Sequence, residues 1–158
     1  MKKQKIILFD IDYTLFDTDI FKESHLETYS LYSEVSEMLA SLQGIAKIGI
    51  FSEGIHEFQK AKLLKTKIHD HFPEEHLHIV AKKDDTLLGI LKKYADCTLF
   101  LVDDKLSILE AAKKQAPSTV TIWIKRGPYA INQSQTDFLP DATVTSLNEV
   151  LPIVANTN

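Results

Sequence analysis

The chain has 158 residues, 44% of them hydrophobic, and a formal net charge of −4 at pH 7. This length and apolar content suffice for one sizeable core, so one domain is expected, and the mild acidity makes nucleic acid an unexpected partner. No apolar stretch approaches the length of a membrane span. The single cysteine, Cys97, cannot form an internal disulfide, and no signal peptide is recognisable because Asp10 interrupts the first apolar run. We therefore expect a cytoplasmic protein without membrane contacts.

The first apolar run, residues 6–9, predicts a strand buried on both faces of a parallel sheet. Asp10, Asp12 and Thr14 follow it in the pattern hhhhDxDxT. Two carboxylates beside a buried strand are costly unless a cation neutralises them. That cation would lie at the carboxyl end of the strand, where α/β sheets place their ligands. The plain alternative is a polar turn, since Asp, Tyr and Thr are common where chains bend.

The chain between the first two strands predicts a flap and a helix. Residues 17–31 are mixed polar and aromatic, which suits one short helix with a flap. Residues 33–43 predict an amphipathic helix with Ser33 as N-cap and a stop at Gly44. Its apolar positions follow the i, i+3, i+4, i+7 spacing: Val35, Met38, Leu39 and Leu42.

The remaining elements alternate between strand and helix. A second strand over 45–51 ends in Ser52-Glu53-Gly54, and the next helix carries Ile55, Phe58 and Ala61 on one side and lysines on the other. A third strand (77–81) ends in Lys82-Lys83-Asp84-Asp85, and a fourth (98–102) ends in Asp103-Asp104. A helix follows each of these strands, then a fifth strand (120–124) and a short strand with a helix over 143–154. Such alternation predicts a parallel sheet covered on both faces, with the first four loops at one edge.

Four histidines in the loop before the third strand raise a zinc hypothesis: His69, His71, His76 and His78. No cysteine joins them, and their spacing fits no familiar zinc pattern. The preferred interpretation is that they line the loop.

The four strand-end loops resemble the motifs of the haloacid dehalogenase (HAD) superfamily, and the resemblance covers essentially the whole chain. The matching phrases are FDIDYTLFD, FSEG, AKKDD and LFLVDD, with weaker matches at HDHFP and LPDATVTSLNEVL. The resemblance implies an α/β fold: a HAD-like Rossmannoid three-layer α/β/α sandwich with a central, mainly parallel sheet. It also implies a single hydrolase domain over residues 1–158, with a flap or minimal cap around 17–32.

The chemistry implied by the resemblance is phosphoryl transfer. Asp10 is the expected nucleophile, forming an aspartyl phosphate, and Asp12 is the expected general acid and base. Family members that act on phosphate keep this second Asp, whereas the dehalogenases lack it. The resemblance therefore favours a phosphomonoester hydrolase over a dehalogenase.

The resemblance also implies a Mg²⁺ cofactor, held by Asp10, the backbone carbonyl of Asp12 and Asp103, with Asp104 adjacent and supporting. The expected contacts to the substrate phosphate are Thr14, Ser52 and Lys82. We prefer Lys82 to Lys83 because Lys82-Lys83-Asp84-Asp85 lines up with the Lys-Pro-Asp-Pro phrase of relatives. Taken singly, each acid of the later loops could instead cap the helix that follows it.

Three departures from the family pattern bear on the substrate. Tyr13 stands where many relatives carry glycine or another small residue, and Glu53 stands where relatives often have Asn or Gly. The chain also lacks room for a cap domain, which predicts a crevice open to water or closed by a second subunit of a homo-oligomer. The expected partner is a phosphorylated substrate, either a small metabolite or a phosphoprotein. The alternative function is a phospho-accepting or Mg²⁺-binding signalling module on the same scaffold, with little turnover.

Overall fold

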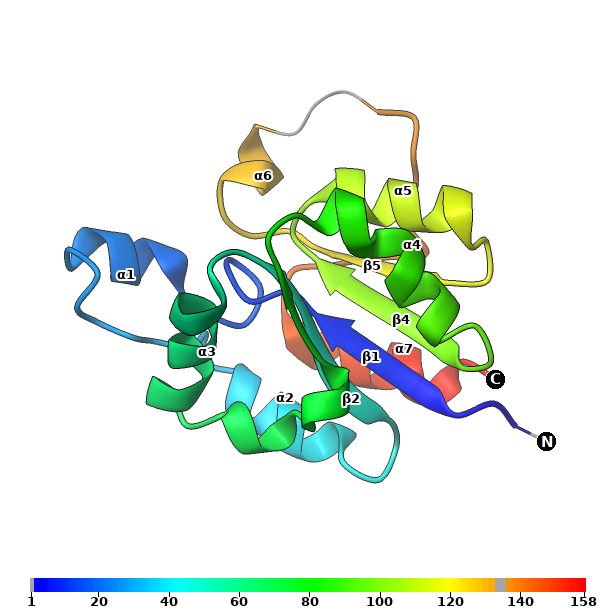
Figure 1. The fold of residues 1–158 in the computed structure, drawn as a ribbon, viewed down its shortest axis with the longest axis horizontal. Coiled ribbons are helices and arrows are strands. Elements are labelled where there is room, and N and C mark those ends of the chain that lie inside the picture. The colour runs from blue at the N-terminus through cyan, green and yellow to red at the C-terminus, as the bar shows by residue number, and fades with distance from the viewer. Residues whose placement is uncertain (1, 133–135) are drawn as a thin grey trace.

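The computed structural model describes residues 2–132 and 136–158. Within them, six strands form one sheet in the order β3-β2-β1-β4-β5-β6, and every neighbouring pair is parallel (Figure 1). The strands are β1 (Lys5–Phe9), β2 (Lys47–Glu53), β3 (Leu77–Val80), β4 (Thr98–Asp103), β5 (Val120–Ile124) and β6 (Ala142–Val144). The predicted three-layer α/β fold with a parallel sheet is confirmed.

Helices cover both faces of this sheet. The α-helices are α1 (Thr18–Glu23), α2 (Val35–Leu42), α3 (His56–Lys65), α4 (Lys83–Lys93), α5 (Leu106–Gln115), α6 (Pro128–Ile131) and α7 (Val150–Asn156). Short 3₁₀ turns lie at η1 (His69–His71), η2 (Glu74–His76) and η3 (Leu147–Glu149). Helices α4 and α5 pack together on one face, while α2 and α7 pack on the other.

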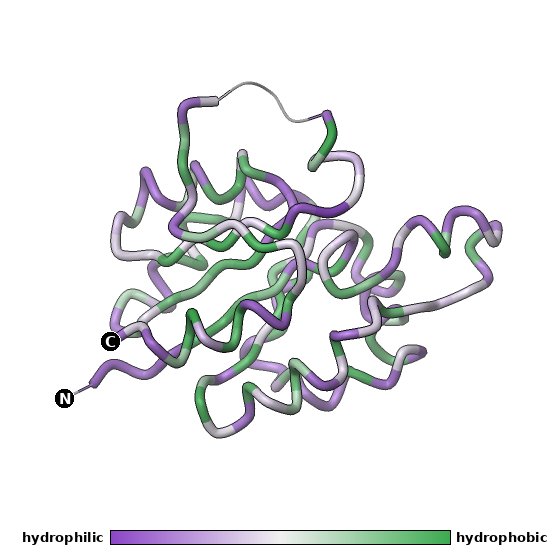
Figure 2. The backbone as a smooth tube through the Cα atoms, turned by 180° about the vertical axis from the view of Figure 1, so that it is seen from behind, coloured by the Kyte–Doolittle hydropathy of each residue, from purple (hydrophilic) through white to green (hydrophobic). Residues whose placement is uncertain are grey.

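The alternating side chains of β1 explain why the sheet has two apolar layers. Ile7 and Phe9 join the core cluster that contains α2 and α7, whereas Ile6 and Leu8 join the cluster that contains α4 and α5. All four are at most 1% exposed, so β1 is buried on both faces as its continuous apolar run predicts. Figure 2 shows the hydrophobic strands inside and hydrophilic stretches outside them.

The order of the strands places a ligand crevice beside β1. β2 and β3 lie in order on one side of β1, and the chain then crosses the sheet so that β4 pairs with the other side of β1. The backbone amide of Asp10 donates to the carbonyl of Val102 at 3.0 Å, so the ends of β1 and β4 are tied together. In open parallel sheets the crevice forms outside the carboxyl ends of strands where the order reverses. Here that point lies between β1 and β4.

Residues 17–31 leave the sheet edge and return to it as a closed excursion. Phe16 pairs with Leu31 in an isolated bridge, and the amide of Asp17 donates to the carbonyl of Ser30 at 2.8 Å. Helix α1 lies within the excursion and projects to one side of the sheet (Figure 1). Phe16 stacks edge-on with Phe21 at 5.3 Å between ring centroids, and Phe21 lies 4.9 Å from Tyr29. This aromatic contact anchors the excursion, which we call the flap.

Two local predictions need correction. Glu34, not Ser33, is the N-cap of α2, and its carboxylate bonds Arg126 rather than the helix amides. Helix α3 also presents the opposite face from the one expected: Ile55 and Phe58 are 59% and 66% exposed, while Gln59 and Lys62 are buried. The expected burial of Ile55 and Phe58 is wrong because Asp12 and Ser52 provide hydrogen-bond acceptors for Gln59 and Lys62 on the other side of the helix. None of the described helices is long and apolar enough to cross a membrane.

Candidate active site

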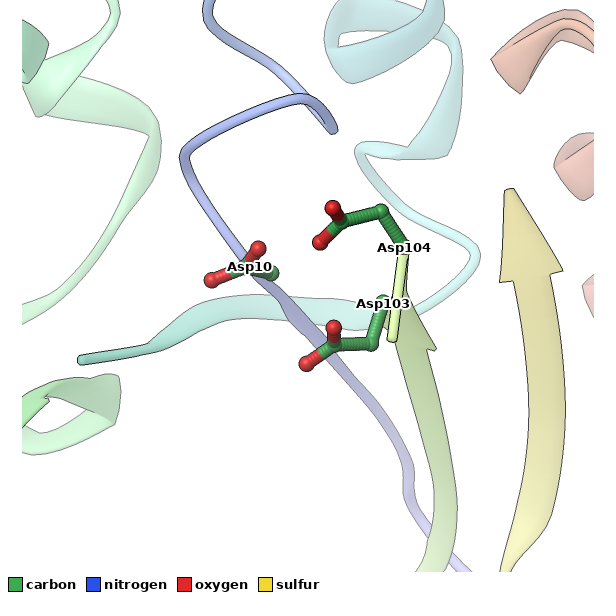
Figure 3. A group of neighbouring side chains, drawn as sticks. All are labelled: Asp10, Asp103 and Asp104. Atoms are coloured by element: carbon green, nitrogen blue, oxygen red, sulfur yellow. The ribbon is translucent and has the colours of Figure 1, made fainter. Parts of the chain in front are cut away.

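Three buried carboxyl groups meet at the carboxyl ends of β1 and β4. Asp10 directly follows β1, Asp103 is the last residue of β4, and Asp104 follows it. One oxygen of each lies within 4.8 Å of the others, and Figure 3 shows the three side chains gathered at the two strand ends. This is the sole cluster of potential metal ligands found among the described residues.

A single ammonium group lies within this cluster, and it belongs to Lys83. Its Nζ donates to Asp10 Oδ1 at 2.9 Å and to Asp103 Oδ2 at 2.6 Å, and the residue is 3% exposed. The preference for Lys82 is therefore corrected. Lys82 is the N-cap of α4 and is exposed, whereas Lys83 is the first helical residue and turns inward.

Glu53 helps to fix this arrangement. Its Oε2 accepts a hydrogen bond from the backbone amide of Lys83 at 2.8 Å. A carboxylate at the first turn of a helix bonds an otherwise unpaired amide and favours the helix dipole. Glu53 thus stabilises the start of α4 at the position that turns Lys83 inward.

Burial and mutual charge perturb the acidity of the whole cluster. Burial raises the pKa of Asp10 to about 6, with Lys83 opposing and Asp103 adding to the rise. Burial, together with the charges of Asp10 and Asp103, raises the pKa of Asp104 to about 10. Burial alone would lower the pKa of Lys83, but the charges of Asp10 and Asp103 outweigh it and raise that pKa above its ordinary value. Among the described residues Lys83 is the ammonium that bonds these acids, and, against the effect of burial, their charges also raise the pKa of the nearby Lys105.

The unpaired oxygens of Asp104 show that a cation fits here. Both carboxyl oxygens are buried and have no hydrogen-bond partner in the described part of the chain. Asp103, in contrast, has both oxygens engaged: Oδ2 by Lys83, and Oδ1 by the backbone amide of Lys105 at 2.9 Å. An all-oxygen donor set with room for water suits a hard divalent cation such as Mg²⁺. Asp10 and Asp104 offer the free oxygens, and Asp103 positions Lys83.

Asp12 is held by side chains from outside its own loop. Its Oδ1 accepts from Lys62 Nζ at 2.8 Å and from Thr18 Oγ1 at 3.1 Å, and its Oδ2 accepts from Gln59 Nε2 at 3.0 Å. Gln59 and Lys62 were missed in the sequence, because a Gln and a Lys on a lysine-rich helix look like solvated surface. The weak amphipathic pattern of α3 was the only signal that could have indicated them.

Ser52 and Thr14 differ in how close they come to this site. Ser52 lies within β2 and accepts a hydrogen bond from Gln59 Nε2 at 2.8 Å, which leaves its own O–H to donate. Thr14 is completely buried, and its Oγ1 has no hydrogen-bond partner among the described residues. Neither residue lines the crevice. Thr14 shapes the loop through its backbone, since its carbonyl accepts from Arg126 Nη1 at 3.1 Å.

The crevice above the acids is a cavity of about 700 Å³. Its walls come from the first loop, the flap, the starts of α4 and α5, and α6. The flap contributes Phe21, Lys22 and Leu26, and the α6 segment contributes Pro128 and Tyr129. The cavity therefore combines a charged floor with partly apolar walls.

Tyr13 explains how a bulky residue is accommodated in the first loop. Its φ of 57° lies in the left-handed region, which favours glycine. Its ring packs on Gly127, where an added Cβ would come within 2.4 Å of the ring. Tyr13 is 8% exposed and lines the cavity, so it narrows the crevice beside Asp12.

Two of the four histidines near β3, His76 and His78, are explained by their contacts with Tyr94. His76 Nδ1 and His78 Nε2 both contact the hydroxyl of Tyr94, at 2.9 and 2.6 Å. Burial lowers the pKa of both rings, that of His78 to about 4. A hydroxyl can donate to one neutral ring and accept from the other, so these two histidines are satisfied as neutral partners of a buried tyrosine.

No protein-family model and no curated protein matches the sequence. Solved structures do match the fold. A structure described as a candidate haloacid dehalogenase-like hydrolase from Burkholderia xenovorans LB400 aligns with a TM-score of 0.79 at 21% identity, over 96% of this chain and 97% of that one. The magnesium-bound HAD hydrolase candidate YfnB from Bacillus subtilis aligns with a TM-score of 0.72 at 12% identity, over 99% and 100%. A predicted phosphoglycolate phosphatase from Haemophilus somnus aligns with a TM-score of 0.71 at 14% identity, over 97% and 99%.

A parallel sheet with acids gathered at the ends of two adjacent strands defines the general class as an α/β protein with a polar crevice. The structural matches specify it further: the chain has the fold of the HAD-like hydrolases.

Proposed function

We propose that this protein is a Mg²⁺-dependent phosphomonoester hydrolase of the HAD superfamily that works through an aspartyl phosphate on Asp10. One observation carries the proposal: Asp10 lies between the ammonium of Lys83, 2.9 Å away, and the unpaired oxygens of Asp104. A buried carboxylate kept ionised by a lysine and a cation is a suitable nucleophile toward phosphorus. The solved structures that share the fold include one bound to magnesium and one named a phosphatase, which supports this assignment.

In the proposed first step, an oxygen of Asp10 attacks the phosphorus of the ester. The new bond joins Asp10 to phosphorus, and the bond from phosphorus to the ester oxygen breaks. The leaving oxygen takes a proton that Asp12 carries, in its acid form, when the ester binds. In the second step, water attacks phosphorus and gives a proton to Asp12. The bond between phosphorus and Asp10 then breaks, inorganic phosphate leaves, and both aspartates return to their initial states.

The other residues of the crevice supply charge and orientation. Lys83 holds Asp10 in place and offsets the negative charge of the incoming phosphoryl group. Ser52 does not line the crevice and acts on the site through Gln59, which bonds both Ser52 and Asp12. Mg²⁺, when bound by Asp10, Asp104 and the backbone carbonyl of Asp12, would supply further positive charge against the phosphoryl oxygens.

The substrate class that we propose is a small phosphorylated metabolite. A cavity of about 700 Å³ lies within the range that encloses small ligands, and the flap supplies one of its walls. The flap thus acts as a minimal cap over one hydrolase domain. A phosphoprotein substrate would instead require the flap to move aside.

The test is phosphate release from an aryl phosphate, with Mg²⁺ or with EDTA, by wild type and Asp10→Asn. We expect Mg²⁺-dependent turnover in wild type and a loss of at least about 10³-fold in the variant, since it removes the nucleophile. Asp85→Asn is the matched control, because Asp85 is exposed on α4 and lies outside the crevice. Activity that persists in Asp10→Asn would refute the assignment of the nucleophile.

One observation favours a second candidate function. The Asp12 carboxylate already accepts three hydrogen bonds, which leaves it fewer lone pairs with which to accept a hydrogen from water. In that case Asp10 would accept a phosphoryl group and keep it, as a signalling module does. Treatment with acetyl phosphate and Mg²⁺ would then yield a long-lived phosphoprotein detectable by intact mass, whereas a hydrolase would return to the unmodified mass within seconds.

A further inference from the structure

Helix α3 buries two polar side chains, Gln59 and Lys62, beside Leu63 and leaves Phe58 exposed. Gln59 and Lys62 are 3% and 9% exposed, while Phe58, the residue before Gln59, is 66% exposed. Burying an ammonium and leaving an aromatic ring in water both cost free energy, so some interaction must offset them. The compensating contacts of both polar side chains lead to the candidate active site.

Gln59 bridges Asp12, which the proposed mechanism uses, and the buried Ser52. Its Nε2 donates to Asp12 Oδ2 at 3.0 Å and to Ser52 Oγ at 2.8 Å, and its Oε1 accepts from Lys62 Nζ at 2.7 Å. The amide therefore has all its polar contacts fixed in one orientation. Because Ser52 accepts from this amide, its hydroxyl hydrogen is directed elsewhere.

Lys62 binds the Asp12 carboxylate oxygen that Gln59 does not contact. Its Nζ donates to Asp12 Oδ1 at 2.8 Å and lies 5.2 and 5.5 Å from the ring centroids of Phe16 and Phe21. Phe21 belongs to α1, so the same ammonium contacts the flap. A cation over two aromatic faces is stabilised where water is scarce.

We propose that Lys62 and Gln59 are positioning residues that hold the Asp12 carboxylate in the geometry needed for proton transfer, with the buried Ser52 hydroxyl as the anchor of Gln59. This inference rests on the proposed function. Fixing a proton donor within a fraction of an ångström matters because general acid catalysis falls steeply with misplacement. Through Phe21, the same lysine links the position of the flap to that of Asp12.

The test compares Lys62→Met with wild type on two substrates, phenyl phosphate and 2,4-dinitrophenyl phosphate. Phenolate needs a proton to leave, whereas dinitrophenolate leaves without one. Displacement of Asp12 should therefore lower kcat/KM for phenyl phosphate by about 100-fold, but for dinitrophenyl phosphate by less than about tenfold. Lys62→Arg keeps a donor and a charge, so we expect it to restore part of the loss.

Lys65→Met is the matched control, because Lys65 lies one turn further along α3. It is exposed and stacks on Tyr29 of the same aromatic cluster at 4.3 Å, but does not contact Asp12. We expect this variant to retain wild-type kcat/KM on both substrates. An equal loss on both substrates in Lys62→Met would overturn the inference, because a general structural defect acts on both alike.

Crystal structures of Lys62→Met and Gln59→Leu provide a measurement that does not depend on turnover. We expect the Asp12 carboxylate to rotate in the first variant, and the Ser52 hydroxyl to change partners in the second. Unchanged side chains in both variants would overturn the positioning role even if activity fell. If wild type hydrolyses neither phosphate ester, the proposed function fails, and these two structures alone decide whether Lys62 and Gln59 position Asp12.

Discussion

Asp103 and Asp104 are neighbours in sequence, yet their replacement by asparagine should have opposite effects on the metal-free protein. Both carboxyl oxygens of Asp104 are buried beside Asp10 and Asp103, and neither accepts a hydrogen bond from another described residue. Because its pKa of about 10 keeps metal-free Asp104 protonated near pH 7, folding has to neutralise this carboxyl; Asp104→Asn removes that cost and still offers an N–H to Asp10. We expect it to raise the free energy of unfolding in EDTA by about 2 kcal/mol, the order of the cost of an unsatisfied buried polar group. For a domain of this size, that is about 4–8 °C in Tm.

The expectation for Asp103→Asn is a decrease of about 1 kcal/mol, because its bond to Lys83 loses charge assistance. The assay is urea unfolding of both variants and wild type in EDTA and again in excess Mg²⁺. Wild type should gain about 2.7 kcal/mol at a Mg²⁺ concentration one hundred times its Kd, and Asp104→Asn should lose most of that gain. Destabilisation by Asp104→Asn in EDTA, or an undiminished gain from Mg²⁺, would refute the assignment of Asp104 as the open metal ligand.

Two further predictions concern single side chains. Lys83→Met should lower the free energy of unfolding by about 3 kcal/mol and reduce turnover at least about 100-fold, because it leaves buried acids without their cationic partner. The matched variant Lys82→Met changes an exposed side chain and should alter stability by less than about 0.5 kcal/mol. Equal effects of the two variants in thermal unfolding and phosphate release would contradict this prediction. Burial lowers the pKa of His78 to about 4, so the folded state binds fewer protons than the unfolded state, and the stability that follows is lost as pH falls from about 6.5 toward 4. Between pH 7.5 and 5, the free energy of unfolding of wild type should fall by about 1 kcal/mol more than that of His78→Leu. This is half the value that the pKa shift alone implies, because the ring is partly exposed. Equal shifts of the urea midpoint in the two proteins would argue against it.

The fold could be predicted because the spacing of apolar side chains in the sequence indicates which side of a strand or helix is buried. The run over residues 6–9 favoured a strand covered on both faces, and the spacing of Val35, Met38, Leu39 and Leu42 indicated the buried side of α2. The edge of the sheet that collects the polar loops then followed from parallel topology alone. Asp10, Asp103 and Asp104 were brought together by that rule.

Polar burial could not be predicted in the same way, because a buried Lys and a solvated Lys look alike in sequence. Lys82 and Lys83 are adjacent at the start of α4, but Lys82 is the extended N-cap and Lys83 is the first helical residue, and only Lys83 reaches the acids. Gln59 and Lys62 are buried only because Asp12 and Ser52, which precede them in the chain, provide acceptors. Their burial is a property of the assembled site.

The inward orientation of Gln59 and Lys62 on α3 has the same origin. Apolar side chains at positions 59 and 62 would have added to the buried apolar surface beside Leu63, and would have left Asp12 bonded only to Thr18 within the described residues. The observed helix forgoes that gain and leaves Ile55 and Phe58 in water. Local departures from the rule of apolar burial are expected where function constrains the side chains. We therefore expect Lys62→Met to keep or raise stability while lowering turnover, and a variant that lost both in proportion would point to a purely structural helix.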